Sequence, residues 1–410
     1  MNVFQSALAA SLALSISSAV SATELEVTHW WTSGGEAEAV AELAKAFDAT
    51  GNKWVDGAIA GSGGAAIPIM ISRITGGDPM GATQFNHGRQ AEELVEAGFM
   101  RDLTALADKE GWKDSVYPPS LLESCTLDGK IYCVPMNIHS WQWLWLSTQA
   151  FEDAGVDVPT NWDEFVAAAP ALEKADIVPL AMGQQSWQTA SAFNVLMATV
   201  AGPEVYNQVF DEKDADVAAG EEVAAVFKAA DDARKMSANS NVQEWNQATN
   251  MVITGKAGGH IMGDWAQGEF QVAGQVAGED YVCLPGLGVN NVISSGGDAF
   301  YFPKIDDPEI SAAQEALAST LLAKETQVAF NLKKGSLPVR SDIDMEAAND
   351  CMRKGLDILA NGTVIKDIPQ MLSADSAGLT EDLFVEFFNN KDMSAEEAQE
   401  QFVEIIADAE

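Results

Sequence analysis

The sequence predicts an α/β protein with two lobes, and three observations support this prediction. The chain has 410 residues, more than one ordinary hydrophobic core holds, so two units are expected. In the first hundred residues, short apolar runs alternate with segments of helical spacing, which indicates a mainly parallel sheet with helices on both faces. An extended aromatic segment at residues 130–147 then leads to a second α/β region that ends near residue 285.

Composition limits the range of functions. Hydrophobic residues make up 47% of the chain and charged residues 20%, which is typical of a globular protein. The 61 acidic and 23 basic residues give a net charge of −38. Such a surface repels nucleic acid and anionic membranes and disfavours acidic ligands. We therefore expect no nucleic-acid partner.

The first 22 residues have the features of a cleaved secretory signal. Their apolar stretch ends in the small residues Ala19–Ala22, a cleavage pattern that makes Thr23 the first residue of the mature chain. A transmembrane anchor is the alternative, but the segment is short and rich in Ser and Ala. No later apolar run is long enough to span a bilayer, so we expect an exported, soluble protein of the periplasm.

The mature chain opens with a strand, a glycine turn and a helix, in the stretch VTHWWTSGGEAEAVAELAKAF. Neighbouring side chains of a strand point to opposite faces, so Trp30 and Trp31 cannot both fill one core. After the turn, Val40, Leu43 and Phe47 recur at helical spacing. We expect one tryptophan to cover a ligand while its neighbour anchors the strand.

The first unit continues with the same alternation. Ile67, Met70 and Ile74 form a second helical stripe, and GATQF is a short buried strand followed by a helix in QAEELVEAGFM. In open α/β sheets, ligands bind beyond the carboxyl ends of the strands, in the loops that lead into helices. The segments WWTSGGE and QFNHGR are both loops of this kind.

The second unit contains helices with N-terminal signals. Thr160, with Asp163 three residues later, is placed to cap a helix whose apolar stripe begins at Phe165. The last segment of the chain is an amphipathic helix with a capping box of Ser394 and Glu397. The extended segments VCLPGLG and GSLPVRS are candidates for further crossings between the lobes.

Four cysteines in an oxidising compartment favour disulfides. Cys125 and Cys133 flank an Asp-Gly turn that returns the chain on itself, which favours a bridge between them and leaves Cys283 with Cys351. Spacing alone leaves all three pairings open. No CxxC pair or close Cys/His cluster indicates a metal site.

Trp187, Trp245 and Trp265 lie among polar residues rather than in apolar runs. A pyranose has apolar C–H faces and hydroxyls around its rim, so an indole covers a face while polar side chains bond the edge. Packing in the core is the alternative for each tryptophan. Two carboxylates, Glu36 and Asp264, suit vicinal hydroxyls, and helix capping is their alternative role.

The four histidines form no metal-binding pattern. His87 and His139 lie in segments rich in polar groups, where a hydrogen bond to a ligand is expected. His29 and His260 lie in predicted strands and are interpreted as structural.

No catalytic motif is present: the chain has no GxSxG elbow, P-loop or GxGxxG turn. A glycosidase that uses Glu36 and Asp264 is an alternative, but acids are so abundant that any two could be nominated. A binder of another glycoside or osmolyte, such as a quaternary amine in an aromatic cage, is a further alternative. We expect a binding protein that needs no cofactor.

Seven segments resemble, in the same order, those of periplasmic glucose-binding proteins, the sugar-binding family that serves bacterial ABC importers. They are HWWTSGGE, GAIAGSGGAA, VPMNIHSWQWLW, GQQSWQ, EWNQA, ITGKAGGHIMGDWAQGEF and KKGSLPVRSD. The resemblance covers nearly the whole mature chain, and its most specific pieces are the double tryptophan with Gly-Gly-Glu and GKAGGHIMGDWA.

The resemblance implies a two-lobed periplasmic-binding-protein fold of type II, similar to maltose-binding proteins and hinge-linked by three crossings. On this likeness, residues 23–134 and 287–335 form the N-lobe, and residues 135–286 and 336–410 form the C-lobe. It also implies a monomer that binds a sugar between the lobes and delivers it to membrane permease subunits. A disulfide between Cys283 and Cys351 matches the family as well.

The ligand contacts that the resemblance implies come from both lobes. They are Trp30, Trp31, Glu36, Gln84, Asn86, His87, His139, Trp187, Gln188, Trp245, Asp264 and Lys334. Relatives have a Lys in the QFNHG loop, an Asn at the position of Gly297 and a His near MLSADS. These departures change which hydroxyl pattern the site accepts, since an unpaired polar group costs about 1–3 kcal/mol.

Overall fold

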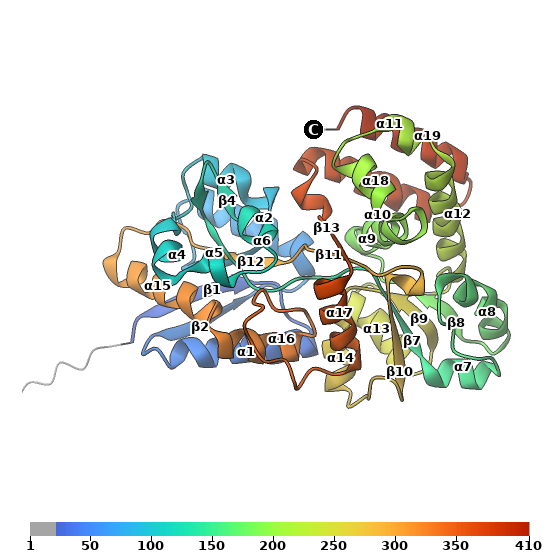
Figure 1. The fold of residues 1–410 in the computed structure, drawn as a ribbon, viewed down its shortest axis with the longest axis horizontal. Coiled ribbons are helices and arrows are strands. Elements are labelled where there is room, and N and C mark those ends of the chain that lie inside the picture. The colour runs from blue at the N-terminus through green and yellow to red at the C-terminus, as the bar shows by residue number, and fades with distance from the viewer. Residues whose placement is uncertain (1–21, 410) are drawn as a thin grey trace, which may run out of the picture.

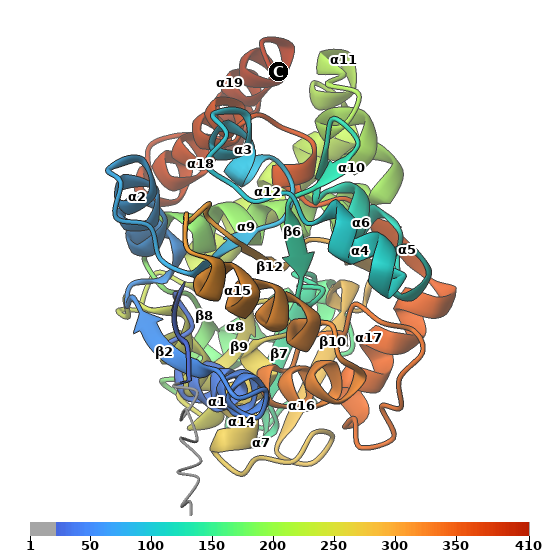
Figure 2. The same ribbon diagram turned by 90° about the vertical axis from the view of Figure 1, so that its left-hand side faces the viewer.

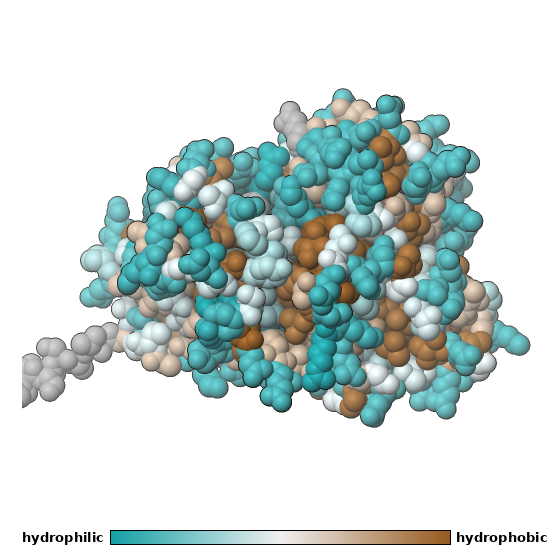
Figure 3. All heavy atoms as spheres, viewed as in Figure 1, coloured by the Kyte–Doolittle hydropathy of each residue, from teal (hydrophilic) through white to brown (hydrophobic). Residues whose placement is uncertain are grey.

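The computed structural model describes residues 22–409, which form two β-sheets side by side, each covered by helices (Figure 1). The predicted signal, residues 1–22, lies outside the described residues except for Ala22. Among residues 22–409, none of the helices combines the length and apolar character needed to cross a membrane. Hydrophilic residues cover most of the outer surface in the view of Figure 3.

The sheet of the first unit has the strand order β2-β1-β3-β12-β6. Its strands are β1 (Glu24–His29), β2 (Lys53–Ala58), β3 (Ala82–Asn86), β6 (Cys133–Pro135) and β12 (Asp298–Tyr301). β1 runs parallel to β2 and β3, whereas β12 runs antiparallel to both β3 and β6. Asp298, the first residue of β12, therefore lies opposite Asn86, the last residue of β3.

The sheet of the second unit has the order β10-β7-β9-β8 and is also mixed. Its strands are β7 (Trp143–Ser147), β8 (Val178–Ala181), β9 (Ala257–Ile261) and β10 (Tyr281–Pro285). β8 and β9 are parallel, but β7 is antiparallel to both of its neighbours. Each sheet is therefore mainly parallel, as predicted, and contains one antiparallel strand, β12 in the first sheet and β7 in the second. The reason is topological: β7 and β12 each enter their sheet from the other unit, so they start at the edge where the local strands end.

Helices enclose both sheets (Figures 1 and 2). Those of the first unit are α1 (Gly34–Asp48), α2 (Ser62–Thr75), η1 (Arg89–Ala91), α3 (Glu92–Glu96), α4 (Thr104–Glu110), α5 (Trp112–Ser115), α6 (Ser120–Glu123), α15 (Pro308–Leu321) and α16 (Lys324–Lys334). Those of the second are α7 (Thr148–Ala154), α8 (Trp162–Lys174), α9 (Ser186–Leu196), η2 (Met197–Ala201), α10 (Pro203–Phe210), α11 (Ala215–Ala218), α12 (Glu221–Met236), α13 (Trp245–Ile253), α14 (Ala266–Val272), η3 (Gly286–Gly288), η4 (Ile368–Gln370), α18 (Ala374–Asn389) and α19 (Ala395–Ala407).

Each unit has its own hydrophobic core. Leu25, Phe47 and Phe300 belong to the core of the first unit, and Phe165 and Phe384 to that of the second. The C-terminal helices α18 and α19 pack beside α9 and α12, so the end of the chain completes the second core (Figure 1).

The chain crosses between the units at residues 136–142, 286–297 and 335–373, which confirms the three crossings. The crossings contain the pair β11 (Val292–Ser294) and β13 (Thr363–Ile365), together with α17 (Asp350–Asn361). Ile138 bridges Leu337, and His139 bridges Gly296, so the three segments lie side by side. The exact lobe boundaries stay a prediction; Leu337 itself packs into the first core.

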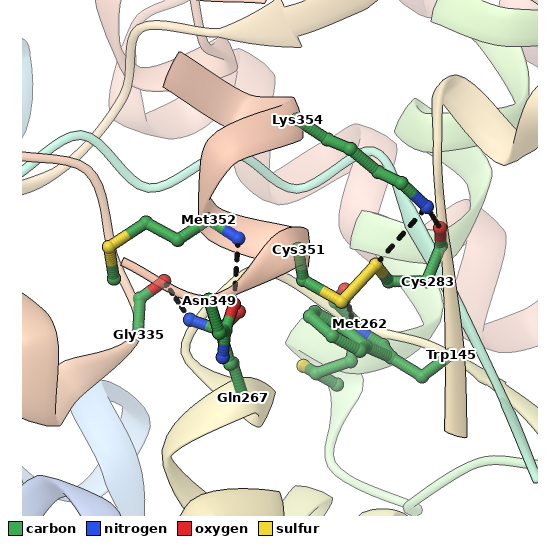
Figure 4. Close-up of a disulfide and its surroundings, with 9 residues drawn as sticks. All are labelled: Trp145, Met262, Gln267, Cys283, Gly335, Asn349, Cys351, Met352 and Lys354. Carbon is green, nitrogen blue, oxygen red and sulfur yellow. Dashed lines mark hydrogen bonds between the residues drawn. A yellow bond between two sulfur atoms is a disulfide. The ribbon is translucent and has the colours of Figure 1, made fainter. Parts of the chain in front are cut away.

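Both predicted disulfides are present. Cys125 and Cys133 close a hairpin of β4 (Thr126–Leu127) and β5 (Lys130–Ile131), whose two turn residues both have positive φ. The bond between Cys283 and Cys351 joins β10 to α17 beside Trp145 (Figure 4).

Two predicted helix caps had different outcomes. Ser394 caps α19 by accepting a hydrogen bond from the backbone of Glu397, as predicted. The assignment of Thr160 as the cap of α8 was wrong, because Asn161 accepts from the Glu164 backbone instead. Thr160 donates its hydroxyl and backbone N–H to the Glu164 carboxylate, so it supports the cap without forming it.

Candidate functional site

A cavity of about 440 Å³ lies between the two units, where the strands of both sheets meet the crossings. Eight predicted binding residues line it: Trp30, Trp31, Glu36, Asn86, His139, Trp187, Trp245 and Lys334. β1 and β3 end at this edge, and β12 begins there, so loops distant in sequence converge on one space.

The two adjacent tryptophans differ in burial. Trp31 is 1% exposed and packs against Phe300 and Phe330, with ring centroids at 5.7 and 5.2 Å. Trp30 is only partly buried and lies next to Gly63 of α2, and both residues border the cavity. Trp31 also borders the cavity, and its buried Nε1 has no hydrogen-bond partner within residues 22–409. That N–H is available to donate to a ligand oxygen.

Glu36 both caps a helix and borders the cavity, so its two proposed roles coexist. Its Oε2 accepts from the backbone of Thr32 and Ser33 at 3.2 Å, which completes a capping box at the start of α1. Its Oε1 accepts from Lys334 Nζ at 2.9 Å. Lys334 is 1% exposed, and its Nζ lies 5.7 Å from the ring centroids of both Trp31 and Trp265. The lysine therefore links the aromatic walls of the two units.

A second buried ion pair lies at the start of β12. His139 Nε2 and Asp298 Oδ2 are 2.6 Å apart, and Gln84 and Asn137 donate to the same carboxylate at 2.5 and 3.0 Å. Burial alone raises the pKa of Asp298, but the charge and hydrogen bond of His139, together with Lys334 and Asn137, outweigh it and hold the pKa at about 2. Asp298 is thus a carboxylate at neutral pH.

Indole rings of the second unit form a continuous wall of the cavity. Trp265 lies 4.7 Å from the His139 ring and 4.5 Å from Trp141, which stands edge-on to it. Trp187 continues the wall at 5.9 Å from Trp141. Asp367 fixes the central ring by accepting from Trp141 Nε1 at 3.1 Å. Rings held in this way offer flat apolar faces beside the polar groups of the first unit.

The other four predicted residues are not part of the lining: Gln84, His87, Gln188 and Asp264. Gln84 supports the cavity from behind, since it donates to Asp298 and accepts from the Trp30 backbone. Gln188 bonds to the backbone of Gly183, and His87 bonds to the Ser124 hydroxyl. Direct ligand contact by these residues stays a prediction.

His29 and His260 have the structural role that was predicted from their strands. His29 ends β1 and pairs with Asp56 at 2.7 Å. His260 lies in β9, contacts the Thr249 hydroxyl at 3.2 Å, and burial lowers its pKa to about 3, so it is neutral.

Asp264 is a buried carboxyl with one satisfied oxygen. Oδ2 accepts from the backbone and hydroxyl of Ser140 in the first crossing, while Oδ1 is buried without a partner among residues 22–409. Burial raises the pKa of Asp264 to about 7, although His139, the Ser140 hydrogen bonds and Lys334 favour the charged form.

Asp264 therefore makes stability depend on pH. Its folded-state pKa is above the ordinary value of 3.8, so the native state holds the proton more tightly, and stability falls as the pH rises from about 4 to 7. Above this range the free energy of unfolding has fallen by about 4 kcal/mol.

The variant Asp264→Asn lacks the charge, so its advantage in unfolding free energy over the wild type should grow from pH 4 to pH 8. Urea unfolding across this range measures it, with the exposed Asp306→Asn as control; parallel wild-type and Asp264→Asn curves would contradict the assignment.

Several cavity residues were not selected from the sequence: Arg89, Gln90, Trp141, Asn194, Asp298, Asp367 and Glu381. Trp141 lies in SWQWLW, where Trp143 and Trp145 are stacked core residues at 5.5 Å, so composition did not distinguish the three. Asp298 follows two glycines at the start of a strand. Only a strand that runs antiparallel to its neighbours starts at the edge of the sheet where the cavity lies, and the sequence did not reveal the direction of β12.

The arrangement suits binding better than catalysis. Of the four lining carboxylates, the two buried ones are engaged by neighbours, Glu36 by Lys334 and Asp298 by His139, and Asp367 accepts from the Trp141 indole. Within residues 22–409, no group of three or more His, Cys, Asp or Glu side chains is arranged to hold a metal ion. What the cavity offers is aromatic faces bordered by hydrogen-bonding groups.

Comparison with known proteins agrees with this geometry. The model of the family described as bacterial extracellular solute-binding protein matches residues 32–308. A probable sugar-binding periplasmic protein of Mesorhizobium japonicum is 35% identical over 414 residues, which cover 98% of each chain. One of the same description from Brucella melitensis biotype 1 is 36% identical over 81% of this chain and 78% of its own.

Solved structures show a similar fold at low sequence identity. A chitin oligosaccharide binding protein superposes with a TM-score of 0.77 at 19% identity, over 95% of this chain and 99% of that one. The maltose-bound T. maritima MalE3 gives 0.75 at 18% identity, over 94% and 99%.

Proposed function

The chain belongs to the family of bacterial extracellular solute-binding proteins, and from that premise we propose that it captures a neutral, glucose-like sugar for an ABC importer. It is a binding protein and not an enzyme. The ligand is a mono- or small oligosaccharide, and the partners are the permease subunits that receive it. Relatives with periplasmic names and the predicted signal support export to the periplasm.

One observation supports a neutral sugar most directly: the cavity combines a wall of indole rings with charged groups that are already paired. Trp265 and Trp141 offer faces for pyranose C–H groups. Glu36 and Asp298 retain acceptor capacity for hydroxyls beside their cations. An anionic ligand would need an unpaired cation, whereas Lys334 is bound to Glu36.

The two units also touch at both ends of the cavity, as expected for lobes closed around a ligand. At the α1 end, Gly35 N–H donates to the Glu269 carboxylate at 2.8 Å. At the η1 end, Gln370 Nε2 lies 3.5 Å from His87 Nδ1. We propose that opening about the three crossings separates these contacts and admits the sugar.

A ligand screen by thermal unfolding tests this function. A ligand at 100 times its Kd stabilises the protein by about 2.7 kcal/mol, so a neutral sugar should raise Tm clearly. Sugar acids and betaine are the comparison set, and aryl glycosides are monitored for turnover. Stabilisation by betaine or a sugar acid without any neutral sugar would reject the proposal, and turnover would favour the glycosidase alternative.

A further inference from the structure

Resting on the proposed function, we propose that the cavity holds two pyranose-sized units, so the ligand is a neutral disaccharide or a glycoside of that size. One pyranose lies between Trp31, Glu36, His139 and Lys334. The other pyranose lies towards α2 and α18, in the part of the cavity called here the outer compartment. This compartment is bordered by Gly64, Ile67, Asn194, Ala377, Gly378 and Thr380.

The size of the cavity is the first argument. A water molecule's share of liquid volume is about 30 Å³, and a hexose has about a dozen non-hydrogen atoms, each taking less room than a separate water because they are covalently linked. One hexose therefore fills only part of the 440 Å³. The units already touch at Gly35–Glu269 and His87–Gln370, so this space is not a product of separated lobes.

The length of the aromatic wall is the second argument. Trp265, Trp141 and Trp187 follow one another at centroid distances of 4.5 and 5.9 Å. The rings meet edge to face, at interplanar angles of 88° and 70°, so they form a stepped aromatic wall that is longer than one indole and leaves apolar surface for a second pyranose. Trp265 lies beside His139 and Lys334, whereas Trp187 starts α9, the helix that also contributes Asn194 to the cavity.

The outer compartment has a glycine on each of its two helical walls. Gly64 of α2 and Gly378 of α18 border the cavity, and a Cβ at either position would meet no atom within 4 Å. Glycine weakens a helix relative to alanine, and neither residue has the positive φ that would require it. Contacts within the protein do not explain these two glycines, and we take them to leave space for a ligand in the cavity that both residues border.

The chemistry of this compartment suits a second neutral sugar. Ile67 and Ala377 are apolar, and Asn194 and Thr380 are uncharged hydrogen-bonding residues. The nearby Arg89 is paired with Glu92, with Nε and Oε2 at 2.9 Å, so its charge is already balanced and does not favour an anionic ligand.

Calorimetric titration of the mature protein with glucose and with glucose-containing disaccharides tests the proposal. The disaccharide set contains maltose, cellobiose and trehalose. Methyl and phenyl glucosides are added because they carry a smaller and a flatter group in place of the second sugar. We expect at least one two-unit ligand to bind about tenfold or more tightly than glucose.

The variant Gly378→Phe places a ring at the outer wall, and Leu379→Phe, at an exposed neighbouring position of the same helix, is the matched control. Gly378→Phe should weaken the two-unit ligand by about tenfold or more and leave glucose within about twofold, while the control changes neither. Gly64→Phe repeats the test from the opposite wall, in case the α18 variant does not fold.

Each outcome decides a specific point. Two results would reject a sugar site in the outer compartment and leave sugar binding by the protein intact. One is glucose binding as tightly as every two-sugar ligand, and the other is an equal loss of affinity for glucose and for the two-sugar ligand in the folded glycine variants. No binding of any sugar by the wild type would reject the proposed function itself.

Discussion

Replacing Asp298 with asparagine is expected to weaken sugar binding by about 100-fold or more. The carboxylate is 0% exposed and is held by His139, Gln84 and Asn137, and its low pKa of about 2 reports how strongly these groups favour its charge. The variant loses a charge-assisted hydrogen bond to a sugar hydroxyl, worth about 1.5–3 kcal/mol, and it also weakens the hold of the carboxylate on the polar groups around it. One of these groups is His139, whose ring lies against Trp265 in the cavity wall.

The effect of Asp298→Asn is separable from general unfolding. Circular dichroism establishes that the variant folds, calorimetry gives its affinity, and Asp306→Asn makes the same charge change at an exposed position. The double variant His139→Gln, Asp298→Asn replaces both partners with neutral amides that can bond each other, so it should regain part of the stability lost in the single variant. If Asp298→Asn alone binds sugar as the wild type does, the ion pair does not shape the site.

The parts of the site that could be predicted are those with a local signal. The glycine turn and capping box place Glu36 at the mouth of a strand, and the alternation of a strand separates Trp30 from Trp31. These features depend on neighbours in sequence, so they could be predicted without knowledge of the fold. The helices α1, α2, α8 and α19 were predicted for the same reason.

The residues that were missed depend on the path of the chain between the units. Asp298 reaches the cavity because β12 arrives from the second unit and runs antiparallel to β3. Trp141 faces Trp265 only because the first crossing lies beside the other two, and Asp367 reaches Trp141 from far along the chain. Sequence periodicity carries no information on such contacts, and for the same reason the antiparallel direction of β12 and β7 could not be predicted.

The glycine turn makes a second strong expectation possible: Gly35→Ala should weaken sugar binding by about tenfold to 100-fold. A Cβ at Gly35 would lie 2.6 Å from the carbonyl carbon of Gly268 and 2.8 Å from its Cα, in the backbone of α14 in the other unit. No rotamer change relieves a clash with backbone, so α1 and α14 must move apart by about an ångström, a displacement that can cost about 100-fold where groups must converge. Glu36 and Trp265 lie within a few residues of this contact and on opposite units, so their separation would widen.

Gly34→Ala is the matched control, because it makes the same change in the same first turn of α1. Its Cβ would meet the Glu269 carboxylate and Val272 at 3.6 Å, which is an ordinary contact. Both variants gain the same helix preference of alanine over glycine, so a difference between them reports the approach of the two units rather than the stability of α1. Calorimetry gives the affinities, and small-angle scattering with and without sugar gives the compaction on binding. The backbones of α1 and α14 are in contact in this structure, and we propose that opening separates them, so Gly35→Ala should reduce both affinity and compaction. Equal behaviour of the two variants would show that this contact plays no part in capture.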